Sequence, residues 1–179
     1  MKICIDPGHG GADPGAIGTT PDRNLDEKTF TLSVSLFLRD ELRDAGHTVI
    51  MTRQQDVFVG LADRAALANQ SDADLFISIH ANAAATPEPE GMEVFCFPGS
   101  VRGRDAATRV LESMVAEFPG HRNRGVKEAN FAVLRLSGMP AILVECEFLT
   151  NPAQLEFLAD EGNQRRLAAA IARAVPAPV

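Results

Sequence analysis

The chain has 179 residues, of which 45% are apolar, which is enough for one hydrophobic core but too little for two well-formed domains. Its formal net charge of -7 argues against a protein that holds nucleic acid through a basic face, so we expect no nucleic acid partner. No stretch is apolar for long enough to span a membrane, and the first residues lack the apolar core of a signal peptide.

The first half of the chain alternates between patterns typical of strands and of helices. Apolar residues at i+4 spacing on one face predict the first helix: Phe30, Val34, Leu38 and Leu42. A loop rich in glycine and proline separates this helix from the first apolar run. In chain order we expect a strand, this loop, a helix, a strand, a helix and a strand, over residues 2–6, 7–23, 26–45, 47–52, 61–70 and 74–80.

The second half continues the alternation. The run over 92–97 predicts an antiparallel or edge strand, and residues 121–130 are expected to form a loop that carries several basic side chains. The other expected elements are a helix, two strands and one or two closing helices, over residues 104–118, 131–136, 141–145 and 152–175. Strands alternating with helices predict the α/β class: a mostly parallel twisted sheet of about six strands with helices on both faces.

Two histidines stand at the ends of apolar runs, His9 after Ile3-Cys4-Ile5-Asp6-Pro7-Gly8 and His80 after Leu75-Phe76-Ile77-Ser78-Ile79. Open α/β sheets bind their ligands at the carboxyl edge of the strands, where both imidazoles are expected. The glycines around His9 do not complete a dinucleotide fingerprint, since Asp13 occupies the third glycine position and would repel a pyrophosphate.

Carboxylates are available to complete a metal site with these histidines. Two imidazoles, one carboxylate and an open position for water are a donor set typical of catalytic zinc. Glu27 stands in the first turn of the predicted helix, where it either binds the metal or only complements the helix dipole. Glu145 ends the run over 141–145, and Glu147 follows two residues later, so on a continuing strand both point to the same side of the sheet. They are either solvated strand-end charges, or one of them is a general base.

A series of motifs in order along nearly the whole chain resembles the zinc-dependent N-acetylmuramoyl-L-alanine amidases of the amidase-3 type. The series comprises Ile5-Asp6-Pro7-Gly8-His9-Gly10-Gly11, Glu27, Gly46-His47-Thr48-Val49, Thr52-Arg53, residues 61–64, Ala68-Asn69, residues 73–82, Val133-Leu134-Arg135, Val144-Glu145 and Phe148-Leu149-Thr150-Asn151. The resemblance implies that His9, Glu27 and His80 bind Zn²⁺ and that Glu145 is the catalytic carboxylate.

The implied reaction is hydrolysis of the amide between N-acetylmuramic acid and L-alanine in peptidoglycan, so the expected partners are the stem peptide and the glycan of that polymer. We expect a monomer, with a catalytic domain over 1–175 and a tail or the start of a linker over 176–179. A phage or prophage endolysin that stays cytoplasmic until its release fits the missing signal peptide, as does a domain cut from an exported cell-wall enzyme.

Two alternatives remain at this point. A zinc peptidase that cuts another peptidoglycan bond would use the same metal and base, and a non-catalytic cell-wall-binding module would need neither. Position 147 is glutamate where similar sequences often carry glycine, so a second carboxylate could raise the pKa of Glu145.

The basic side chains are expected to have structural or substrate-binding roles. Arg64 is expected to be a packing and salt-bridge residue of its helix. Four side chains of the predicted loop are either solvated or contact the carboxylates of the stem peptide: His121, Arg122, Arg124 and Lys127.

Overall fold

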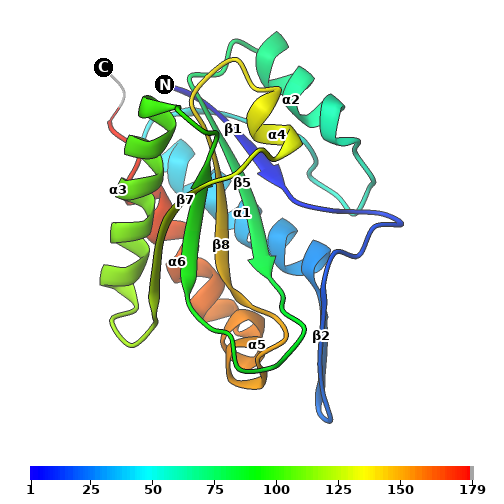
Figure 1. Ribbon diagram of the computed structural model, residues 1–179. Coiled ribbons are helices and arrows are strands. Elements are labelled where there is room, and N and C mark those ends of the chain that lie inside the picture. The colour runs from blue at the N-terminus through cyan, green and yellow to red at the C-terminus, as the bar shows by residue number, and fades with distance from the viewer. Residues whose placement is uncertain (178–179) are drawn as a thin grey trace.

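The computed structural model describes residues 1–177, and its centre is a six-stranded sheet (Figure 1). Four strands run parallel, β6 is antiparallel to its neighbour β8, and β7 is parallel to β6. Across the sheet the order is β4 (Thr48–Met51), β1 (Lys2–Pro7), β5 (Leu75–Asn82), β8 (Ala141–Phe148), β6 (Met92–Cys96) and β7 (Asn123–Glu128). The predicted mixed, mostly parallel α/β sheet is therefore confirmed, as is the antiparallel strand near residue 92.

Helices cover both faces of the sheet, which explains why the central strands are apolar on both sides. The larger core lies against α1 (Glu27–Asp44), α3 (Val101–Glu117), α5 (Pro152–Ala159) and α6 (Glu161–Arg173). A smaller core on the other face lies against α2 (Leu61–Gln70) and α4 (Ala132–Arg135). Ile3, Cys4 and Ile5 of β1 are all fully buried, as a strand packed on both faces requires.

Three sequence predictions were wrong in local structure. The expected loop over 121–130 contains β7, an edge strand whose residues are all partly or fully exposed and therefore lack an apolar alternation. The expected strand over 131–136 is instead the single turn of α4. There the consecutive residues Val133 and Leu134 are both buried in the smaller core, whereas a strand would direct them to opposite faces.

The third correction concerns the expected loop over 7–23, which includes the first strand and the turn of an antiparallel hairpin. Its strands are β2 (Ile17–Thr20) and β3 (Arg23–Asp26), and β3 leads directly into α1 (Figure 1). The hairpin thereby determines where the first residue of α1, Glu27, lies. Among the described residues, no helix is both long and apolar enough to cross a bilayer. The expected tail over 176–179 extends beyond the described residues.

Candidate metal centre

His9 lies in the glycine-rich loop that follows β1. The loop turns back at once, since the amide of Gly10 donates to the carbonyl of Asp13 over 2.9 Å and the amide of Asp13 donates to that of Gly10. His9 itself has a φ of 61°, an uncommon conformation for a residue with a side chain. Its Nδ1 lies 2.9 Å from Oδ2 of Asp13. This contact orients the imidazole so that Nε2 is directed toward the interior of the site.

Two buried arginines hold the backbone of this loop. Arg64 donates to the carbonyl oxygens of Pro7 (2.6 Å) and His9 (2.7 Å), and it forms a buried ion pair with Asp6 (2.8 Å). Arg53 donates to the carbonyls of Pro7 (3.0 Å) and Gly8 (2.9 Å). The expected salt bridge of Arg64 is therefore confirmed. Its contact with the carbonyl of His9 gives the arginine a second role that the sequence did not indicate.

His80 reaches the same place from β5. Its ring packs so closely over Gly8 that a Cβ at position 8 would lie 2.3 Å from Cε1 of His80. The ring centroids of His9 and His80 are 5.0 Å apart, with an edge-to-face orientation. A glycine at position 8 is thus a steric condition for bringing the two imidazoles together.

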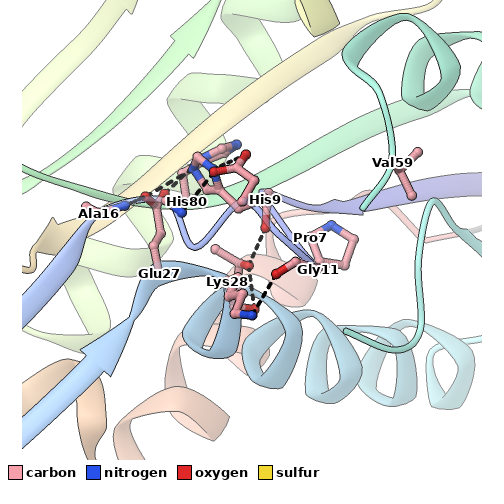
Figure 2. Close-up of polar contacts among 12 residues, drawn as sticks. Pro7, His9, Gly11, Ala16, Glu27, Lys28, Val59 and His80 are labelled. Carbon is pink, nitrogen blue, oxygen red and sulfur yellow. Dashed lines mark hydrogen bonds and ion pairs between the residues drawn. The ribbon is translucent and has the colours of Figure 1, made fainter. Parts of the chain in front are cut away.

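The carboxylate of Glu27 lies between the two imidazoles (Figure 2). Its Oε1 is 2.9 Å from Nδ1 of His80 and accepts the amide of Ala81, while its Oε2 is 3.1 Å from Nε2 of His9 and accepts the amide of Ala16. Burial disfavours its charge, but the contacts with His80 and His9 hold the pKa of Glu27 far below its ordinary value. The carboxylate is therefore ionised and fixed by backbone donors rather than used as a helix cap.

The three side chains fit a zinc ion by chemistry and by spacing. His9, Glu27 and His80 each offer one ligand atom, and these atoms lie within 4.8 Å of one another. The imidazole nitrogens and carboxylate oxygens that contact one another in this partly buried site are all atoms that bind zinc. A bound cation would replace the protons that they now share. Burial lowers the pKa of His9, but the carboxylates of Glu27 and Asp13 outweigh it and raise that pKa above its ordinary value.

Glu145 lies beside this group. On the adjacent strand β8 it is the register partner of His80, and it lines the same cleft. Its Oε2 is buried and has no hydrogen-bond partner. Burial raises the pKa of Glu145 well above its ordinary value, and the negative charges of Glu27 and Glu93 raise it further. A carboxyl group with this proton affinity and a free oxygen atom can accept a proton from a molecule in the cleft.

The sequence did not single out Glu93, and Glu147 was expected to be the carboxylate near Glu145. Glu93 of β6 is the register partner of Glu145 and is 3% exposed. It accepts hydrogen bonds from the side-chain Nδ2 of Asn82 (2.6 Å), from Nε of Arg124 (2.9 Å) and from the ammonium group of Lys127. The sequence signal was a glutamate within the apolar run Met92–Cys96. Arg124 and Lys127, expected to be solvated or to contact substrate, neutralise this buried carboxylate.

Glu147 is directed away from the base. The β5–β8 register shifts between His80 and Asn82, so β8 does not keep the regular alternation that would place Glu145 and Glu147 on one side. Oε2 of Glu147 accepts the amide of Gly91 over 2.6 Å, and Oε1 lies 2.8 Å from Nδ1 of His121. The carboxylates that raise the pKa of Glu145 are consequently Glu27 and Glu93, and the expectation for Glu147 was wrong.

A cleft of about 580 Å³ opens over the three candidate ligands and Glu145. The residues before α2 form one wall and the start of α4 forms another, while the carboxyl ends of β1, β5 and β8 form the floor. The cleft thus lies at the sheet edge predicted for the two histidines, and its volume is in the range of small-molecule and cofactor sites.

Comparisons with known proteins agree with this geometry. Residues 3–177 match the Amidase_3 family, described as N-acetylmuramoyl-L-alanine amidase. The amidase AmiC2 of Nostoc punctiforme has the same fold, with a TM-score of 0.91, 36% identity and coverage of 97% of this chain and 94% of that chain. An amidase structure from Clostridium difficile 630 gives a TM-score of 0.91, 38% identity and coverage of 97% and 93%.

The relatives also differ from this chain in length. The amidase AmiC of Neisseria meningitidis is 37% identical over an alignment of 216 positions, gaps included, which covers 97% of this chain but 51% of that protein. The chain therefore spans about half the length of this relative. Fold, family match and identity agree over nearly all of its residues: the chain belongs to the N-acetylmuramoyl-L-alanine amidase family.

Proposed function

We propose that the chain hydrolyses the amide that joins N-acetylmuramic acid to L-alanine in peptidoglycan, with Zn²⁺ held by His9, Glu27 and His80 and with Glu145 as the catalytic carboxylate. One observation carries this proposal. In a chain of this family, two imidazoles and a buried carboxylate converge beside a second carboxylate that has a free oxygen and a raised proton affinity.

When bound, zinc polarises the scissile carbonyl and makes a coordinated water more acidic. Glu145 takes a proton from the attacking water as its oxygen adds to the carbonyl carbon, and returns the proton to the leaving nitrogen as the C–N bond breaks. The first transfer starts from the ionised carboxylate of Glu145. Burial and the neighbouring carboxylates raise its proton affinity, which favours taking the proton from water. Asp13 keeps a proton on Nδ1 of His9, leaving Nε2 free to bind the cation.

Purified peptidoglycan tests the proposal directly. Zinc-loaded chain should release amino groups of L-alanine without new reducing sugars, and a chelator should abolish the release. Glu145→Gln is the matched variant, because it keeps the shape of the side chain but cannot accept the proton. New reducing sugars, or release that is indifferent to the chelator, would contradict the proposal.

The same digest separates the alternatives. A zinc peptidase would expose amino groups of other residues, and a cell-wall-binding module would sediment with peptidoglycan but expose no new ends. We further propose that residues 1–175 are the catalytic domain of a cell-wall enzyme, because relatives such as the LytC amidase of Bacillus subtilis contain a matching region as 29% of a longer chain. An endolysin origin and a monomeric state stay predictions.

A further inference from the structure

The walls of the cleft carry aromatic side chains that the fold leaves uncovered. Phe58, in the segment before α2, is 63% exposed, and Phe131, which precedes α4, is 39% exposed. Both line the cleft above the candidate metal ligands, and Leu61 of α2, 60% exposed, lines it as well. Large exposed apolar side chains around a cleft mark a surface that binds apolar groups of a ligand.

The backbone that carries Phe58 is fixed to the loop of His9. A Cβ at Gly11, where φ is +59°, would lie 2.6 Å from the amide nitrogen of Phe58, so the two backbones touch. Asp56 strengthens this contact, since its carboxylate accepts the amide of Gly11 over 2.7 Å and an N–H of Lys28 over 2.9 Å. Figure 2 shows Lys28 reaching toward Gly11. Phe58 is thus exposed at a rigid position, which reduces the entropy lost on binding.

Phe131 is held on the second wall, at the start of α4. Its carbonyl accepts the amides of Leu134 (3.1 Å) and Arg135 (2.9 Å) at the start of α4. Its ring packs edge-to-face on Phe95, with centroids 5.2 Å apart. Both aromatic walls are therefore formed before any ligand arrives.

The charges in the cleft favour a neutral ligand at these walls. The charged lining residues belong to the floor, where Arg64 is paired with Asp6 and His9 contacts Asp13 and Glu27. Among the described lining residues, no Lys is present and the one Arg is already paired. Carboxylates of a stem peptide would find no cationic partner at the walls. A pyranose ring is uncharged, and its C–H faces can stack on aromatic rings.

We infer that Phe58 and Phe131 are glycan-binding residues, which hold the pyranose ring of N-acetylmuramic acid at these walls while its lactyl amide lies over the floor. The inference rests on the proposed function, because it assigns the sugar half of that substrate to these walls. The stem peptide then leaves the cleft away from them.

Two substrates that differ only in the sugar test this assignment with the zinc-loaded chain. One is N-acetylmuramoyl-L-alanyl-D-isoglutamine, and the other is the corresponding lactoyl dipeptide without the pyranose. Phe58→Ala and Phe131→Ala should each raise KM for the first about tenfold, equivalent to about 1.4 kcal/mol. The kcat of both variants should stay within about twofold of the wild type, because a contact made equally in the ground state and the transition state affects KM but not kcat. KM for the second substrate should stay within about twofold.

Leu136→Ala is the matched control, because Leu136 is 43% exposed at the end of α4 but does not line the cleft. It should leave both substrates unaffected. Phe58→Leu keeps an apolar side chain but no aromatic ring, so its KM for the sugar substrate should lie between those of the wild type and Phe58→Ala. An unchanged KM for the sugar substrate would overturn the inference. Equal increases for both substrates would overturn it too, because the rings would then contact the peptide.

A binding measurement separates this inference from the proposed function. Saturation-transfer NMR with the disaccharide of N-acetylglucosamine and N-acetylmuramic acid, which has no scissile amide, should show transfer to the pyranose protons in the wild type. The transfer should weaken in both phenylalanine variants and persist in the control. If neither amide substrate is cleaved, the proposed function fails, but the NMR result still tests the binding of the sugar. Absence of saturation transfer in the wild type would overturn the inference that the walls bind the glycan.

Discussion

Replacing Arg64 with methionine tests whether the arginine both stabilises the fold and positions His9. The guanidinium is 3% exposed and donates to Val59 (2.9 Å), Pro7 (2.6 Å), His9 (2.7 Å) and the carboxylate of Asp6 (2.8 Å). Methionine retains much of the apolar volume but has no donor. Asp6 would then keep only the hydroxyl donors of its other neighbours, and three backbone carbonyls would each lose a hydrogen bond.

The expected loss is a large part of the stability of the domain. Removing one partner of a buried ion pair costs about 3–5 kcal/mol, because the other charge stays buried. A domain has a free energy of unfolding of roughly 5–15 kcal/mol. At about 2–4 °C per kcal/mol for a chain of this size, Tm of the variant should fall on the order of 6 to 20 °C. Release of the His9 carbonyl should weaken zinc binding about 10- to 100-fold, as for other groups that orient a ligand.

Thermal unfolding of the metal-free chain and competition for zinc with a chelating dye measure the two effects. Arg104→Met is the control, because the ion pair of Arg104 with Glu128 is exposed and should add little. Arg64→Lys keeps the charge, but one ammonium group cannot serve all four acceptors, so it should recover only part of both losses. A fall in Tm no larger than that of the control, or unchanged zinc affinity in a folded Arg64→Met variant, would refute the reasoning.

Three further outcomes are expected. Glu145→Gln should lower kcat about 10²–10⁴-fold with little change in zinc content, measured as initial rate and by metal analysis, and a smaller loss would remove its role as base. In the metal-free chain the raised pKa of Glu145 makes its ionisation costly, so the same variant should increase Tm relative to wild type more at pH 8 than at pH 4; equal gains would contradict this. Asp13→Asn should weaken zinc binding about 10- to 100-fold through Nδ1 of His9, whereas loss of His80 should abolish it, both followed by dye competition.

The sequence was most informative where contacts are local or strands are apolar throughout. Apolar spacing placed α1 within one residue at each end, and the alternation of elements predicted α2 at Leu61–Gln70. Polarity misled at β7, because an edge strand that pairs on one side need not be apolar. An apolar run misled at α4, whose single turn is selected by burial of Val133 and Leu134 against α2.

The amino-acid order by itself determined the α/β sheet, the arrival of His9 and His80 at one edge, and the family resemblance that named Glu27 and Glu145, since these depend on runs and motifs along the chain. Only the tertiary structure decided that Glu93 rather than Glu147 faces Glu145. The reason is that a register shift and the pairing of distant strands determine which carboxylates meet, and neither is encoded in local spacing.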